Sequence, residues 1–217
     1  MDMVLEELFE SPKLVLYVDK FQRRLADEQK RRAQFYEEMT ERQKTEFING
    51  EVIVHSSVKL RHTNVGRNLL VLLSAYVSKH DLGLVGYEKM LITLTRNDCE
   101  PDICFFAQAK AQSFAPDQMH FPAPDFVVEV LSPSTAKNDR GIKLIDYAAH
   151  GVAEYWLIDP DTRFVEQYLL DGDEYLLARK TDSGQIASTV VEGFAIPVYA
   201  IFDDDAQWQA LQKIMQN

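Results

Sequence analysis

The spacing of apolar residues along the chain begins with a long helical pattern. Between Pro12 and Gly50 no other glycine or proline occurs, and apolar residues recur there at helical spacing: Leu14, Val18, Phe21 and Leu25. Ser11-Pro12 suits a helix start, because serine caps helices and proline favours the first helical position. We therefore expect a helix of about 30 residues, roughly 45 Å long.

Two roles for this helix are open. If unbroken, it would overhang a body whose radius of gyration is about 17 Å, as an arm for packing or self-association. If broken near Asp27-Glu28, it would instead lie, solvated, on its own domain.

The centre of the chain alternates helical and strand-like patterns. Asn49-Gly50 lies between two short apolar runs, which indicates a hairpin turn. A 3.6-residue apolar period predicts an amphipathic helix over 61–80, closed by Gly83. Strand-like runs follow at 84–95, 102–106 and 126–131, then a short helix over 139–150 and a buried strand at 155–158.

The last quarter of the chain has a β pattern. It predicts a hairpin of strands 164–170 and 175–179 around Asp171-Gly172, and a last strand near 186–191. We expect three parts: an N-terminal helical extension over 1–45, one folded domain over 46–202 and a helical tail over 203–217.

Composition narrows the class of protein. At 217 residues the chain can bury roughly 70% of its unfolded surface, so it needs no disulfide framework. No stretch approaches the ~18 apolar residues of a membrane span, and the first ten residues are acidic where an export signal is basic. We expect a cytoplasmic protein without a membrane partner, in which Cys99 and Cys104 are reduced and buried.

The net charge of −11 opposes long-range attraction to nucleic acid. Its distribution weakens that objection. Residues 159–217 hold 4 basic and 11 acidic side chains, a net −7, whereas residues 46–158 hold 10 and 13, only −3.

Two carboxylates occur where burial should exclude them. Asp102 opens the apolar run 103–106, and Glu129 interrupts the apolar run 126–131. A buried carboxylate costs several kcal/mol unless it is paired, protonated or metal-bound. Period-2 alternation also allows Glu129 to face away from the core, so either residue alone has an ordinary structural explanation.

The following helix supplies a cation. Asp139, Lys143 and Tyr147 share one face of it, and Asp139 is an ordinary i,i+4 partner for the lysine. The opposite apolar face is expected to pack on the sheet: Ile142, Ile145 and Ala149.

These residues carry a family resemblance. Glu100-Pro101-Asp102, the run DFVVEVLSPST, the helix just described and the run HGVAEYWLIDP resemble the Uma-type putative restriction endonuclease family, which is abundant in cyanobacteria. That family is similar to the PD-(D/E)XK nuclease superfamily. The resemblance covers about residues 39–202. It implies an α/β (α+β) restriction-endonuclease-like fold: an αβββαβ core with a mixed central sheet, here with a long N-terminal helix and a C-terminal β-hairpin.

The resemblance also implies a site. Asp102 matches the aspartate of PD, and Glu129 the acidic residue of the (D/E)XK half-motif; together they would hold Mg²⁺ or Mn²⁺. The lysine expected two residues after Glu129 is Leu131, and Lys143 matches the helix lysine that takes its place in the family. Glu51 matches a recurrent family glutamate and could be a further ligand, or a solvent-facing hairpin residue. DNA is the implied substrate, and a homodimer or higher homo-oligomer the implied assembly.

Other residues give weaker indications. His62 could open its helix near the site, although a lone histidine is more often a cap or a surface group. Tyr155 and Trp156 suit a buried strand better than a base-stacking platform. Three functions follow: a Mg²⁺-dependent DNA endonuclease, a catalytically inactive member of the fold that serves in self-assembly or protein binding, or a hydrolase of another phosphate ester.

Overall fold

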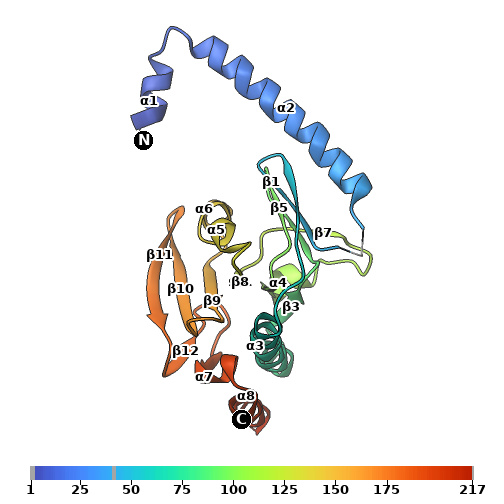
Figure 1. The fold of residues 1–217 in the computed structure, drawn as a ribbon, viewed down its shortest axis with the longest axis vertical. Helices are drawn as coiled ribbons and strands as arrows, with labels where there is room; N and C mark the ends of the chain where they lie inside the picture. Colours follow the sequence, from blue (N-terminus) through green and yellow to red (C-terminus); the bar gives the residue numbers. More distant parts are fainter. Residues whose placement is uncertain (1–2, 41–42, 217) are drawn as a thin grey trace.

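A six-stranded mixed sheet forms the centre of the protein. The computed structural model describes residues 3–40 and 43–216 (Figure 1). The sheet contains β3 (Gly83–Tyr87), β6 (Ile103–Ala107), β8 (Phe126–Val130), β9 (Glu154–Asp159), β10 (Phe164–Asp171) and β11 (Glu174–Thr181). Their order is β11-β10-β9-β8-β6-β3, and β8 and β9 are parallel. Helix, three strands, helix and strand follow one another in the chain, which confirms the predicted core.

A second sheet contains the predicted Asn49-Gly50 hairpin. Its order is β2-β1-β5-β4-β7, from β1 (Thr45–Ile48), β2 (Glu51–Val54), β4 (Leu91–Thr93), β5 (Asp98–Cys99) and β7 (His120–Phe121). The single strand expected over 84–95 is wrong, because β3 and β4 belong to different sheets. Glu88 bends the chain between them with φ +40°, without the glycine or proline that would reveal a break.

One face of the central sheet is covered by the amphipathic helix α3 (Leu60–His80). It ends at Asp81 in the left-handed region, φ +53°, rather than at Gly83, which begins β3. Ile103 and Phe105 face this helix, whereas Cys104 and Phe106, which alternate with them, face the opposite layer. The chain end completes the first layer with β12 (Gln185–Ala187), β13 (Ala195–Pro197), α7 (Tyr199–Phe202) and α8 (Asp204–Gln216).

The other face carries the short helices α4 (Gln108–Ala111), α5 (Ala136–Asp139) and α6 (Ile142–Ala149). The helix expected over 139–150 is therefore two helices with Gly141 between them. A Cβ at Gly141 would lie 2.7 Å from the carbonyl oxygen of Lys137, so this close turn requires glycine. The expected apolar face is also wrong: Ile145 is 63% exposed, and Lys143 and Tyr147 are buried instead.

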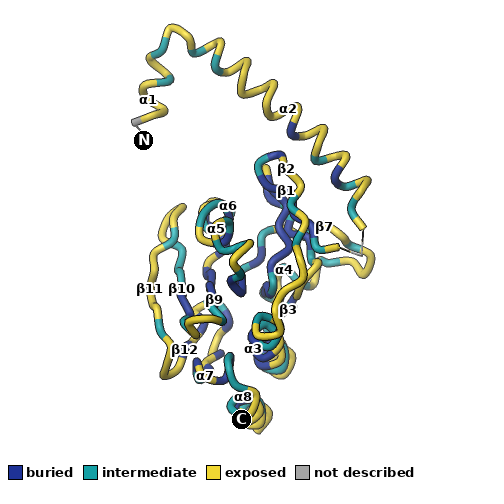
Figure 2. Tube along the Cα trace, in the orientation of Figure 1, coloured by how far each residue is buried: buried dark blue, intermediate teal, exposed yellow. Residues whose placement is uncertain are grey.

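The long helix α2 (Leu14–Glu38) is unbroken and follows the short α1 (Met3–Phe9). Its C-terminal half docks on the second sheet, where Phe35 is buried and the Arg32 guanidinium contacts both oxygens of buried Asp98 at 2.6 and 2.7 Å. Its N-terminal half extends past the body as an exposed arm (Figures 1 and 2). The helix is thus an overhanging arm, not one broken near Asp27-Glu28.

The C-terminal hairpin and the two cysteines can also be compared with the sequence. The predicted tail hairpin is β10–β11, whose turn holds Gly172 at φ +67°. The strand expected near 186–191 is shorter and ends at Ala187. Cys99 and Cys104 are free and buried, and burial raises the pKa of Cys104 to about 12. Within 3–40 and 43–216 no helix is long and apolar enough to cross a membrane.

Helix α2 should detach from the body in acid. Glu28 is 3% exposed, and hydrogen bonds from Arg96, opposed by burial and aided by Arg24, lower its pKa from 4.5 to about 2. Because the folded-state pKa is depressed, this stabilisation is complete above about pH 4.5 and is lost as the pH falls towards 2. The protection factors of the α2 amides, which correct for the pH dependence of intrinsic hydrogen exchange, should therefore fall less steeply from pH 6 to pH 2.5 in Glu28→Gln than in the parent.

The matched control is Glu37→Gln, which neutralises an exposed carboxylate on the same helix. It should keep the parent's pH dependence. Equal pH dependence in Glu28→Gln and the parent would contradict the assignment.

Candidate active site

The two carboxylates singled out from the sequence lie side by side. Strands β6 and β8 are antiparallel neighbours that pair Ile103 with Val128, so Asp102, just before β6, lies opposite Glu129 on β8. The Val130 amide donates to Asp102 Oδ2 at 2.8 Å, and the Asp102 amide reaches Glu129 Oε2 at 3.4 Å. Glu129 is 2% exposed, so alternation along β8 does not carry it to solvent.

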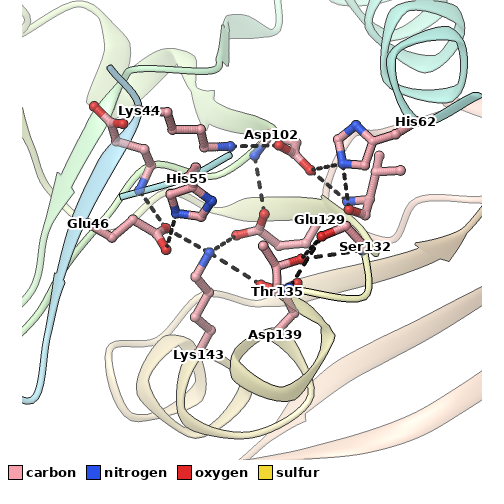
Figure 3. A network of polar contacts seen from close by, with 12 residues as sticks. Lys44, Glu46, His55, His62, Asp102, Glu129, Ser132, Thr135, Asp139 and Lys143 are labelled. Carbon is pink, nitrogen blue, oxygen red and sulfur yellow. Dashed lines mark hydrogen bonds and ion pairs between the residues drawn. The ribbon is translucent and has the colours of Figure 1, made fainter. Parts of the chain in front are cut away.

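A buried lysine joins three carboxylates beside them. Lys143 Nζ, from α6, lies 2.7 Å from Glu46 Oε1 on β1, 2.9 Å from Glu129 Oε1 and 3.3 Å from Asp139 Oδ1 at the end of α5 (Figure 3). The ammonium group donates a hydrogen bond to Glu129 and forms ion pairs with all three carboxylates. The predicted i,i+4 partner Asp139 is therefore the most distant of three.

Asp102 has cations of its own. Lys44 Nζ lies 2.7 Å from Oδ1, and His62 Nε2 lies 3.5 Å from Oδ2 and 2.8 Å from the Val130 carbonyl oxygen. Burial alone would raise the pKa of Asp102, but Lys44 and His62 outweigh it and hold that pKa well below its usual range. In turn the pKa of His62 is raised: burial would lower it, and the hydrogen bond and charge of Asp102 prevail.

Glu129 has the opposite shift. Burial raises its pKa to about 8 against the attraction of Lys143, and the charges of Asp139 and Asp102 add to the rise. Asp139 is likewise raised, mainly by burial, and neither of its oxygens accepts a hydrogen bond from a described residue. The opposite shifts of Asp102 and Glu129 mean that Asp102 gives up its proton more readily than Glu129 does.

These groups line a pocket of about 400 Å³. Asp102, Glu129, Asp139 and Lys143 face it together with Lys44, His62 and the loop that holds Ser132, Ser134 and Thr135. The hydroxyls of that loop bind one another: Ser132 Oγ lies 3.0 Å from both Ser134 Oγ and Thr135 Oγ1. The pocket therefore offers carboxylates on its floor and hydroxyls and cations along its sides.

The donor set suits a divalent cation. Four carboxylates, Glu46, Asp102, Glu129 and Asp139, meet only two lysines, which leaves a charge of −2 when the histidines are neutral. Within the described part of the chain no three His, Cys, Asp or Glu side chains converge as ligands. A cation would thus bind through Asp102 and Glu129 and complete its shell with water, which is how Mg²⁺ is commonly held.

Sequence reasoning missed three contributors. Lys44 directly precedes the first hairpin, Glu46 lies on its first strand and His55 directly follows its second strand. His55 Nε2 lies 2.9 Å from Glu46 Oε2. Lys143 and His55 outweigh burial and lower the pKa of Glu46 to about 2. Glu51, the glutamate that the resemblance selected, is exposed on β2 and does not line the pocket. Glu46, on the opposite strand, is the one that reaches Lys143.

Another buried carboxylate shows what a structural role looks like. Glu154 is fully buried on β9 but accepts hydrogen bonds from neutral donors: Trp156 Nε1 at 2.6 Å, Gln167 Nε2 at 2.7 Å and Ser188 Oγ at 2.7 Å. It joins the sheet to the loop before β13 and lies outside the pocket. Tyr155 and Trp156 are fully buried, as expected of a core strand.

Removing the shared ammonium should destabilise the fold strongly. Lys143→Met leaves three buried carboxylates without their cation, so we expect a loss of roughly 3–5 kcal/mol in the free energy of unfolding by urea. The double variant Glu129→Gln/Lys143→Met should lose less than the two single losses added together, because one of the stranded charges is gone.

Ile145→Met changes an exposed side chain on the same helix and is the control, with an expected effect within about 0.5 kcal/mol. If Lys143→Met unfolds like this control, the ammonium does not hold the cluster together.

Comparison with known proteins places this site in a family. A solved structure of a putative nuclease belonging to DUF820 from Anabaena variabilis has the same fold, with a TM-score of 0.64 at 19% identity over 75% of this chain and 90% of that one. No curated protein matches the chain. The family model Uma2, described as putative restriction endonuclease, matches residues 32–199. The match spans the whole pocket and well over half of the chain, which therefore belongs to the Uma2 family of putative restriction endonucleases.

Proposed function

We propose that this protein is a divalent-metal-dependent endonuclease that hydrolyses DNA phosphodiester bonds. One observation carries the proposal: Asp102 and Glu129 lie opposite each other on adjacent strands at the floor of an open pocket, in a chain of a restriction endonuclease family. Mg²⁺ or Mn²⁺ bound there would lower the pKa of a coordinated water and stabilise the charge that develops on the phosphate.

Two lysines beside the carboxylates have different roles in the proposed reaction. Lys143 acts as a positioning residue, because its three carboxylate partners hold it away from substrate and fix the Glu129 carboxylate. Its pKa is raised well above the usual value, since three carboxylates outweigh burial, so it stays charged. Among the described residues Lys44 pairs with one carboxylate, Asp102, at the pocket wall, which leaves N–H donors for a phosphate oxygen.

The acidic surface shapes how DNA would bind. Repulsion from a chain of net charge −11 predicts weak, strongly salt-sensitive binding that depends on the local cations of the pocket and on the bound metal. The neighbouring surface adds cations: Lys59 and Arg61 line a second pocket that shares His62 and the Ser132–Ser134 loop with the first. These positive side chains offer DNA phosphates a path to the floor carboxylates.

Nicking of supercoiled plasmid in Mg²⁺ or Mn²⁺ tests the proposal. Asp102→Asn and Glu129→Gln should each slow nicking about 100-fold or more, because a metal supplies several kcal/mol of transition-state stabilisation. Both should also weaken Mn²⁺ binding in calorimetric titration.

Asp173→Asn is the control, since it neutralises an exposed carboxylate in the β10–β11 turn and should nick like the parent. Glu51→Gln should also stay close to the parent if its exposed position on β2 keeps it out of catalysis. Equal nicking by Asp102→Asn and the parent would refute the proposal.

A second candidate is a catalytically inactive member of the fold that serves in self-assembly or protein binding. It is favoured by the lysines that already pair with both carboxylates, Lys44 with Asp102 and Lys143 with Glu129. The same titration separates the two, because an inactive site predicts no metal binding that depends on these carboxylates. The homo-oligomer implied by the family resemblance stays a prediction of either function.

A further inference from the structure

The exposed arm carries an unusual share of the apolar surface. Of the large apolar side chains exposed in the described residues, eight lie within positions 4–25: Val4, Leu5, Phe9, Val15, Leu16, Val18, Phe21 and Leu25. Large apolar side chains exposed in this number over one short segment mark an interaction surface. The family match begins at residue 32, so this surface lies outside the part of the chain that the nuclease family accounts for.

The arm is held rigidly where it leaves the body. Besides the two contacts to Asp98, the Arg32 guanidinium donates to the carbonyl oxygens of Leu94, Thr95 and Asn97 at 2.8 to 3.1 Å. One turn earlier, Glu28 accepts from Arg96 at 2.8 and 2.9 Å. These bonds and Phe35 lie on one stripe of α2, and residues 14, 18, 21 and 25 continue the same stripe beyond the body at heptad spacing.

The stripe of residues 14, 18, 21 and 25 can pack against the same stripe of a second, antiparallel copy of the helix. Its spacings are four, three and four residues, so a second helix running antiparallel places Leu14 opposite Leu25 and Val18 opposite Phe21, a small side chain against a large one. Both pairs recur under a two-fold axis, as an isologous interface requires. Tyr17 and Arg24, which flank the stripe, also meet across that axis, and an arginine stacks favourably on an aromatic ring.

The charges of the arm favour the same arrangement. Helix α1 carries Glu6 and Glu7 and no basic residue, and Glu10 follows it directly. Residues 20–31 of α2 are basic by contrast, because Lys20, Arg23, Arg24, Lys30 and Arg31 outnumber Asp27 and Glu28. In an antiparallel pair, residues 20–31 of one α2, which hold five basic and two acidic side chains, pass the N-terminal end of the other, where α1 is attached (Figure 1). Acidic α1 of one copy would then face basic α2 of the next.

We propose that the arm pairs with the arm of a second copy of this chain, through an antiparallel contact of residues 14–25. Among the described residues, Val18, Phe21 and Leu25 of the stripe are exposed and Leu14 is half-buried. The stripe is anchored to the body at its C-terminal end, is self-complementary in reverse order and is flanked by opposite charges. The contact is independent of the catalytic pocket, so it holds whether or not the pocket cleaves DNA.

Sedimentation velocity of the full chain over a dilution series tests the pairing. The parent should sediment as a particle of two 24.9 kDa chains, and Phe21→Glu/Leu25→Glu should raise the dimer dissociation constant about 100-fold or more and run as a folded monomer. Ala26→Glu adds the same charge per substitution at an exposed position off the stripe and should leave the dimer intact.

Oxidative cross-linking tests the direction of the contact. A mixture of Val18→Cys and Phe21→Cys chains should cross-link faster than either variant alone, because those positions meet only in the antiparallel register. The native thiols do not compete, since Cys99 and Cys104 are buried. Faster cross-linking of Val18→Cys alone would overturn the antiparallel pairing.

Three results would overturn the proposal as a whole. They are a monomeric parent throughout the dilution series, a dimer that survives Phe21→Glu/Leu25→Glu, and a monomer whose arm instead binds phosphatidylserine vesicles. Loss of nicking activity by itself bears on the proposed function and not on this contact. Sedimentation measures dimerisation through the arm, whereas nicking measures the activity of the pocket.

Discussion

The buried ammonium of Lys143 is the interaction on which the rest of the molecule depends. Its three carboxylate partners come from three elements: Glu46 from the second sheet, Glu129 from the central sheet and Asp139 from α5. Such a group is costly to bury and stable only when every donor is satisfied, so the position of each element depends on the others. The same requirement turns α6 so that Lys143 faces inward and Ile145 faces solvent.

The cations around the site balance part of its acidic charge. Lys44, Lys143 and the nearby His62 balance part of the negative charge of the carboxylates. The negative charge that is left over, together with burial, raises the pKa of Glu129. Glu154 shows the contrast: it is equally buried but is surrounded by neutral donors and by no cation. Burial alone therefore does not distinguish a reactive carboxylate from a structural one; the charges that surround it do.

Much of the fold and the floor of the site could be predicted from the sequence, because both depend on local patterns. A carboxylate inside an apolar strand reveals Asp102 and Glu129, and helical spacing joins Lys143 to Asp139. The rest depends on contacts between distant segments. Choosing Glu46 over Glu51 requires the way the first hairpin packs, and the exposure of Ile145 reverses the apolar pattern because an ion cluster outweighs it. The break between β3 and β4 occurs at Glu88, whose positive φ could not be predicted because no glycine or proline marks the position.

The Arg32–Asp98 contact ties the arm to the site through the chain itself. Asp98 begins the short segment that runs through β5 to Asp102, and the helix that carries Arg32 leads into the segment that carries Lys44 and Glu46. Without the C-terminal half of α2, the fully buried Asp98 would lose the guanidinium that pairs with it, and the segment that leads to Asp102 would lose its contact with the helix. The docked half of α2 is therefore part of the architecture of the site, whereas the exposed arm beyond it is not.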